Sequence, residues 1–151
     1  MKVMIIMGSQ SDESVMNESR NWLNWFGIEN EMVVASAHRN PDKVKDLMVT
    51  AQEKGFGVVI AAAGMAAALP GVCAAYTSLP VLGVPLEAGL PGGIDALYSI
   101  VQMPAGLPVG TLAVGKAGAR NAAVMAARIF ALSNPAIAEK VAAFKEQGYK
   151  I

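Results

Sequence analysis

Near its start the chain carries the stretch Lys2-Val3-Met4-Ile5-Ile6-Met7-Gly8-Ser9-Gln10-Ser11-Asp12-Glu13. The apolar run Val3–Met7 is typical of a buried strand, and the polar segment from Gly8 to Asp12 ends it. Asp12 belongs to a residue type that caps helices, and Glu13 adds negative charge to a first helical turn. The stretch therefore predicts a strand followed directly by a helix, the repeating unit of parallel sheets.

The same alternation of short apolar runs and helical patterns continues along the chain. The expected strands are Val3–Met7, Glu31–Ala35, Val58–Ala62, Val81–Val84 and Val109–Val114. The expected helices run from Asp12 to Gly27, from Asn40 to Gly55, from Gly64 to Tyr76 with an interruption at Pro70-Gly71, and over Ile94–Val101, Asn121–Leu132 and Pro135–Gln147. This pattern predicts an α/β fold with a five-stranded parallel sheet covered on both faces. No linker or repeat divides residues 1–151, so a single domain is expected.

Composition narrows the class of protein. Of 151 residues, 54% are hydrophobic and 16% charged, which predicts a large core and argues against disorder. Twelve basic and 12 acidic residues balance, so nucleic acid is not an expected partner. The single cysteine excludes an internal disulfide, and the apolar run Val58–Leu69 is too short for a bilayer. We expect a soluble cytoplasmic protein whose apolar excess is buried in subunit interfaces.

Ligands of such folds bind beyond the carboxyl ends of the strands, which makes the loops after the strands the candidate site. These loops are Gly8–Asp12, Ser36–Pro41, Ala63–Gly71, Pro85–Gly93 and Gly115–Asn121. Much of the glycine of the chain lies in them, and glycine allows the backbone to approach a ligand closely.

The only histidine, His38, stands in the loop Ser36-Ala37-His38-Arg39-Asn40-Pro41. An imidazole transfers protons near neutral pH, and a guanidinium holds phosphate or carboxylate. His38 and Arg39 are therefore candidates for acid–base catalysis and anion binding, although both could be solvated surface residues. The Gly8–Asp12 loop suits phosphate or ribose, or is an ordinary capped turn.

Other reactive side chains give weaker indications. Lys116 could meet an anion at the mouth of a site or lie in solvent. Cys73 lies in an alanine-rich segment and is expected in the core. One histidine and one cysteine cannot build a usual zinc site, and the loops contain no cluster of carboxylates, so no metal is expected.

Several segments together resemble the class I PurE family of N5-carboxyaminoimidazole ribonucleotide mutases. They are Met7–Asp12, Ser36–Pro41, Leu69–Gly71, Ser99–Pro104 and Gly115–Ala119 followed by Asn121-Ala122-Ala123. The resemblance implies a flavodoxin-like three-layer α/β/α sandwich and a homo-octamer. It also implies an enzyme of purine biosynthesis that acts on a small nucleotide, with no metal, ATP or organic cofactor.

The reaction implied by the resemblance moves a carboxyl group from the exocyclic nitrogen of the substrate to carbon C4 of the imidazole ring. The route is decarboxylation, capture of the enclosed CO2 by C4 and removal of the C4 proton, with His38 as the proton carrier. Ser9 and Arg39 would hold phosphate and Asp12 the ribose hydroxyls. The remaining residues implied in the substrate pocket are Ser11, Ser36, Gly64, Ala66 and Leu69. The helix at about 135–147 is expected to pack on a neighbouring subunit.

One departure from the family pattern affects the expected activity. The family usually carries histidine before Leu-Pro-Gly, where this chain has Ala68 in the run Gly64–Gly71. Class II relatives, which carboxylate aminoimidazole ribonucleotide directly with CO2, also have alanine there. The mutase is the first expectation. A direct carboxylase and a non-catalytic module that binds a phosphorylated metabolite are the alternatives.

Overall fold

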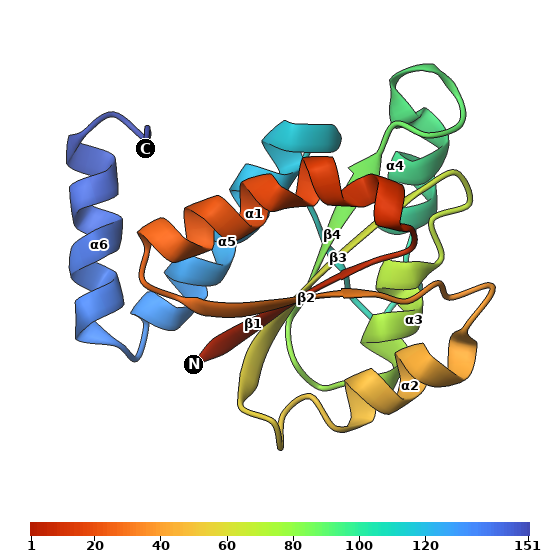
Figure 1. Cartoon of the computed structure of the whole chain (residues 1–151), viewed down its shortest axis with the longest axis horizontal. Coiled ribbons are helices and arrows are strands. Elements are labelled where there is room, and N and C mark those ends of the chain that lie inside the picture. Colours follow the sequence, from red (N-terminus) through yellow and green to blue (C-terminus); the bar gives the residue numbers. More distant parts are fainter.

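Five parallel strands form the central sheet of the computed structural model, which describes residues 1–151 (Figure 1). The strands are β1 (Lys2–Met7), β2 (Glu29–Val34), β3 (Phe56–Gly64), β4 (Val81–Leu86) and β5 (Gly110–Thr111). Their order across the sheet is β2-β1-β3-β4-β5, the order of flavodoxin-like folds. The predicted α/β class and five-stranded parallel sheet are confirmed.

Helices follow the strands and cover both faces of the sheet. The α-helices are α1 (Glu13–Trp25), α2 (Pro41–Val49), α3 (Leu69–Tyr76), α4 (Ile94–Val101), α5 (Gly115–Ala131) and α6 (Pro135–Glu146). Short 3₁₀ turns, η1 (Gln10–Asp12) and η2 (Pro91–Gly93), precede α1 and α4. None of the helices has the length and apolar character needed to cross a membrane.

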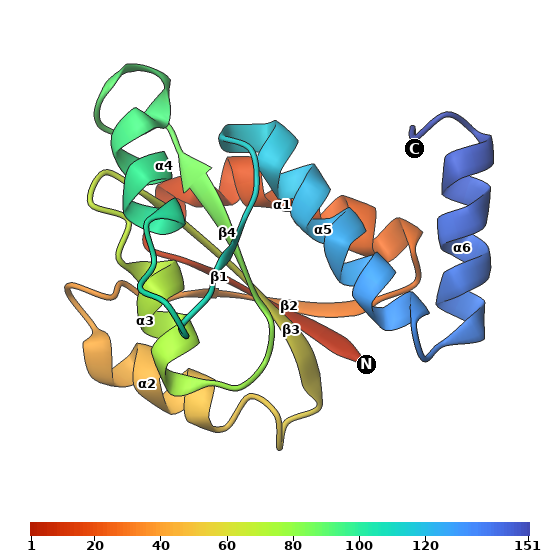
Figure 2. The same ribbon diagram turned by 180° about the vertical axis from the view of Figure 1, so that it is seen from behind.

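The strands build a separate core on each face because successive side chains of a strand point in opposite directions. On β1, Val3, Ile5 and Met7 pack with α1, α5 and α6, whereas Met4 and Ile6 pack with α2, α3 and α4. All these side chains are buried, which explains why β1 reads as a continuous apolar run. Figures 1 and 2 show the two helical layers from opposite sides of the molecule.

The C-terminal helix α6 is attached to the α1–α5 layer through Phe144, which is buried together with Ile137. The ring of Phe144 lies 5.4 Å from that of Trp22 and 5.8 Å from that of Trp25, measured between centroids. The two tryptophans therefore share one packing partner. The remaining face of α6 is largely exposed.

Several expected boundaries were wrong, and the helix expected to run to Gly55 ends at Val49 as α2. The segment from Gly64 to Ala68 is not helical: β3 continues to Gly64, and α3 begins at Leu69 with Pro70 in its first turn. A proline has no N–H to donate, so it is tolerated where a helix starts and not within it. At the sheet edge, β5 contains only 2 residues in place of Val109–Val114: Gly110 and Thr111, which pair with Leu82 and Gly83 of β4.

Helix α5 also begins earlier than expected, at Gly115, so the predicted Gly115–Asn121 loop was wrong. Gly118 lies where the helix passes the preceding chain: a Cβ atom placed on it would overlap the carbonyl oxygen of Ala113. Glycine is therefore required at this helical position by close packing, although it is a poor helix former.

We predict that Gly118→Ala lowers the free energy of unfolding by about 1–3 kcal/mol, because overlap with a carbonyl outweighs the better helix propensity of alanine. Urea unfolding followed by circular dichroism measures the effect. Lys116→Ala, at an exposed position of the same helix, serves as the control and should change stability by less than about 0.5 kcal/mol. A more stable Gly118→Ala protein would show that the close approach does not exist.

Candidate active site

The register of the sheet aligns the loops that follow β1, β2 and β3. Met7, at the end of β1, pairs with Val34 on one side and with Ala62 on the other. The ladder continues for one more residue, since the N–H of Ala35 donates to the carbonyl of Met7 at 2.9 Å. The loops beginning at Gly8 and Ala35 thus leave the sheet at one level, next to the end of β3 (right side of Figure 1).

These loops enclose a cavity of about 520 Å³, within the range of small-molecule sites. The lining residues are Gly8, Ser9, Ser11, Asp12, Ser36, Ala37, His38, Arg39, Ala63, Gly64, Met65, Ala66, Ala67, Ala68, Leu69 and Ala88. Every site residue expected from the sequence lies in this lining. The structure thus brings together residues that the chain separates by up to 60 positions, whereas the roles given to them remain predictions.

The loop after β1 is a compact turn held by its own side chains. The Ser9 hydroxyl accepts a hydrogen bond from the N–H of Ser11, and the Asp12 carboxylate accepts one from the N–H of Ser9 at 3.1 Å. This reciprocal arrangement is a capping box at the start of η1. The Asp12 side chain therefore binds the N–H of Ser9 and does not cap α1, contrary to the prediction from the sequence. The Ser11 hydroxyl donates to the Ser9 hydroxyl at 2.9 Å. The turn thus presents hydroxyl and carboxylate groups to the cavity in a fixed arrangement.

Partial burial raises the pKa of the Asp12 carboxyl above its ordinary value of 3.8. Hydrogen bonds from Ser9 and Ser11 and the positive charge of Arg39 act in the opposite direction. A partly desolvated carboxylate is stabilised by a ligand that donates hydrogen bonds to it. Ribose hydroxyls are donors of this kind.

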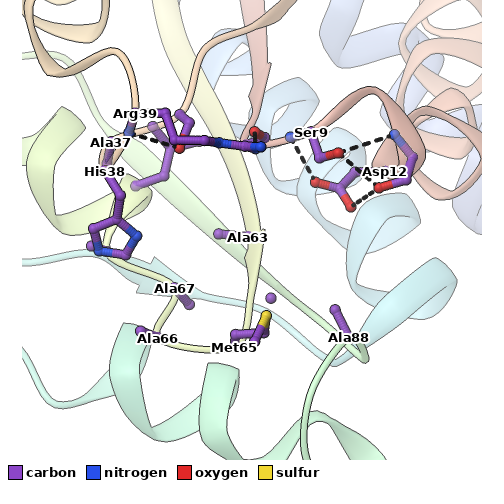
Figure 3. A pocket seen from close by; sticks show the side chains of 16 residues that line it. Ser9, Asp12, Ala37, His38, Arg39, Ala63, Met65, Ala66, Ala67 and Ala88 are labelled. Carbon is purple, nitrogen blue, oxygen red and sulfur yellow. Dashed lines mark hydrogen bonds between the residues drawn. The ribbon is translucent and has the colours of Figure 1, made fainter.

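The loop after β2 carries the positive charge of the site. The guanidinium of Arg39 donates through Nη2 to the carbonyl of Gly8 at 2.9 Å, and so connects the β2 loop to the β1 loop (Figure 3). The backbone N–H of Arg39 donates to the hydroxyl of buried Ser36 at 3.3 Å. Arg39 remains exposed, and its other side-chain donors are free to bind an anion.

The imidazole of His38 lies on the same loop and makes no hydrogen bond within the protein. Figure 3 shows it on the side of the cavity where Ala66 and Ala67 lie, while Arg39 extends toward Ser9. Asp12, His38 and Arg39 are the ionisable side chains of the lining. Histidine is the residue type among these three that most often serves as a general acid or base.

The loop after β3 provides small side chains and an unusual backbone. Met65 and Ala67 adopt positive φ angles of 55° and 30°, a conformation that costs about 1–3 kcal/mol for residues other than glycine. The N–H of Ala67 donates to the carbonyl of Gly64 at 3.0 Å and closes the turn. Ala68 is the N-cap of α3 and makes no side-chain cap. Only a methyl group therefore occupies the position at which the family pattern has histidine.

The fourth loop reaches the cavity through Ala88, which sequence reasoning missed as a site residue. A Cβ atom on Gly64 would lie 2.5 Å from the Cβ atom of Ala88, so only glycine at the end of β3 allows this contact. The glycine at position 64 was the available signal. It did not identify its partner, because that requires the strand order.

Some candidate residues lie outside the cavity. Lys116 is exposed on α5, 3.9 Å from the Glu18 carboxylate. Cys73 is buried in the core as expected, and burial raises the pKa of its thiol to about 12, so it is no thiolate nucleophile at neutral pH. No three His, Cys, Asp or Glu side chains lie together as metal ligands would.

The helices that follow β1, β2 and β3 begin at the edge of the cavity. The positive ends of α1, α2 and α3 favour an anion there, in addition to the charge of Arg39. Together with the hydroxyls of the β1 loop, this arrangement suits a phosphorylated ligand. Fold and site define a flavodoxin-like α/β protein with a cavity of small-molecule size at the carboxyl edge of its sheet.

Comparison with known proteins identifies the family. The sequence profile of the AIR carboxylase family matches residues 2–150, and the chain belongs to this family. It is 52% identical over 145 residues to the N5-carboxyaminoimidazole ribonucleotide mutase of Vibrio cholerae, covering 96% of this chain and 90% of the relative. The mutase of Escherichia coli is 52% identical over 130 residues, covering 86% and 77%. A crystal structure of PurE from Treponema denticola superposes with a TM-score of 0.85 at 29% identity, covering 97% and 90%.

We predict that Asp12→Asn changes how stability depends on pH. Because burial raises the folded-state pKa of Asp12, the wild type loses stability as the pH rises from 3.8 toward neutrality and this carboxyl ionises in the cavity. Asparagine keeps a carbonyl acceptor for the Ser9 N–H and cannot ionise. Urea unfolding of both proteins at about pH 4 and about pH 7 should show the stability of Asp12→Asn rising relative to the wild type. An unchanged or falling difference would contradict the assigned cause of the shift.

Proposed function

We propose that this protein is an N5-carboxyaminoimidazole ribonucleotide mutase that forms 4-carboxyaminoimidazole ribonucleotide. The relatives of that name are about half identical over nearly the whole chain. The observation that carries the proposal most strongly is the combination of His38 and Arg39 in one cavity with Ser9 and Asp12. This set supplies one proton carrier, one anion site and groups for a sugar, which is what an isomerisation of a nucleotide requires.

In the proposed reaction the bond between the exocyclic nitrogen and the carboxyl carbon breaks first. Its electron pair stays on nitrogen, which takes a proton from His38, and CO2 is released inside the cavity. Carbon C4 of the ring then attacks CO2, and the proton displaced from C4 returns to His38. One imidazole suffices, because it gives and regains the same number of protons in each cycle.

The charged groups orient the substrate in this proposal. The guanidinium of Arg39 and the hydroxyl of Ser9 hold the phosphate at the junction of the β1 and β2 loops. The Asp12 carboxylate accepts hydrogen bonds from the ribose hydroxyls. Ser11 and Ser36 support these contacts through the hydrogen bonds described above. The ring then extends toward the alanine-lined part of the cavity, where Gly64, Ala66 and Leu69 lie.

Ala68 favours one competing function on the same scaffold, direct carboxylation of aminoimidazole ribonucleotide by CO2. Its methyl group gives the cavity no hydrogen-bonding side chain at the position where most family members have histidine. Turnover of the N-carboxylated substrate, compared with turnover of aminoimidazole ribonucleotide plus bicarbonate, separates the two reactions. A protein that binds the nucleotide and turns over neither substrate would be a binding module.

We further propose that the enzyme is a cytoplasmic homo-octamer. Large apolar side chains remain exposed on a single chain, among them Leu132 at 88%, Tyr98 at 61% and Leu90 at 56% exposure. Ile94, Tyr98 and Val101 form an exposed apolar stripe along α4, with one helical turn between successive members. The exposed face of α6 is proposed to contact a neighbouring subunit. Sedimentation at several concentrations tests this assembly, and a persistent 15.7 kDa species would contradict it.

We predict that His38→Asn lowers kcat by at least about 100-fold, because general acid–base catalysis contributes about 10²–10⁴-fold. Asparagine has a similar shape and does not carry protons, so the dissociation constant for the product nucleotide should change by less than about threefold. A spectroscopic assay of the carboxylated product and calorimetric titration measure the two effects.

The matched control is Lys54→Gln, which alters an exposed residue in the turn before β3, at the opposite edge of the sheet. It should leave both constants unchanged. Full turnover by His38→Asn would refute the role of the imidazole.

A further inference from the structure

Met65 is the one large exposed apolar side chain in a lining that otherwise consists mainly of glycine, alanine and polar residues. It is 60% exposed, whereas the other large apolar residue of the lining, Leu69, is 2% exposed. Its backbone is in the left-handed region, with φ at 55°. Figure 3 shows it on the cavity wall between Ala66 and Ala88, on the far side of the cavity from Arg39 and Ser9.

The side chain of Met65 lies against the loop that follows β4. A Cβ atom placed on Gly89 would be 3.2 Å from Cγ of Met65 and would overlap the carboxylate of Asp95. Gly89 therefore leaves just enough room for the thioether to pass over the loop. A larger residue there would overlap Asp95 and crowd Met65.

The loop beneath Met65 is held by hydrogen bonds of its own. The carboxylate of Asp95 accepts from the N–H of Leu90 at 3.1 Å, and that of Glu87 accepts from the N–H of Gly92 at 3.0 Å. The N–H of Gly93 donates to the carbonyl of Leu90 at 3.0 Å. Met65 thus rests on an ordered backbone, and the strand-end turn that carries it is fixed by the Ala67–Gly64 hydrogen bond.

We infer that Met65 is a further residue that determines the outcome of the reaction: its side chain covers the ring-binding end of the cavity and retains the CO2 released there. This inference rests on the proposed function. Between decarboxylation and recarboxylation, the C–N bond has broken and the C–C bond to C4 has not yet formed. During this interval only the walls of the cavity hold CO2. Alanine methyls and a thioether give an apolar wall, and water that would carry CO2 away has few partners on it.

The residue type suits a cover over a bound ring. Methionine is unbranched, has three rotatable bonds and makes favourable contacts with aromatic rings. Its side chain is 60% exposed, so rotation about its own bonds brings it toward a ring in the cavity. A glycine would adopt φ at 55° without strain. The turn of the backbone alone therefore does not require methionine at position 65. The function of the side chain explains why the strained conformation is kept.

Met65→Gly tests the inference cleanly, because it removes the side chain and keeps the backbone conformation available. The substrate carries ¹³C in its carboxyl group, and the reaction is run as a single turnover with enzyme in excess, unlabelled bicarbonate and carbonic anhydrase. Mass spectrometry then gives the fraction of product that keeps the label. In the wild type, most of the product should retain the ¹³C label. In Met65→Gly, the labelled fraction of the product should be at least threefold lower.

Two further variants distinguish a loss of CO2 retention from a loss of folded protein. Met65→Leu preserves apolar volume and should keep the label as the wild type does. Met65→Gln preserves length with a polar end and should lose label, and it carries the test if Met65→Gly does not fold. Equal label retention by wild type and the folded Gly or Gln variant overturns the role of Met65. A wild type that never converts the N-carboxylated substrate refutes the mutase function itself, which is a distinct outcome.

Discussion

The common direction of all five strands is the constraint on which the site depends. Because every strand runs the same way, the loops after β1, β2 and β3 meet at one edge, and the register places their first residues at one level. The hydrogen bond from Arg39 to the carbonyl of Gly8 then joins two of these loops at the mouth of the cavity. The phosphate-binding chemistry proposed for this edge follows from that junction: a guanidinium held in place, with unused donors, beside the N-terminus of a helix.

The volume of the cavity comes from small side chains, and its outline depends on a strained turn after β3. Gly64 allows β3 and the β4 loop to touch, and alanines at positions 66 to 68 leave space where larger side chains would fill it. The left-handed backbone at Met65 and Ala67 turns the chain sharply between strand and helix. Strain of this kind persists where the surrounding packing fixes the backbone, and it is concentrated at binding and catalytic sites. The same turn therefore both widens the cavity and places Met65 on its wall.

Much of this arrangement was readable from the sequence. Apolar runs predicted each strand, both ends of α4 were correct, and the resemblance grouped His38 and Arg39 with Ser9 and Asp12. The rest depends on contacts between distant segments. Ala88 reaches the cavity only because β4 lies next to β3, and the close approach of α5 to Ala113 is what requires glycine at position 118. The low helix propensity of glycine predicts a loop near Gly115, where the structure has a helix. No rule based on local sequence predicts the positive φ angle of Met65.

The central claim is that one imidazole faces the reacting carbon of a nucleotide whose phosphate lies on Arg39. A crystal structure of the protein with aminoimidazole ribonucleotide bound tests it most directly. We expect the ring of His38 within about 3–4 Å of C4, the phosphate in contact with the Arg39 guanidinium, and the thioether of Met65 over the imidazole ring of the ligand. A nucleotide bound with its phosphate away from Arg39, or with C4 out of reach of His38, would contradict the account.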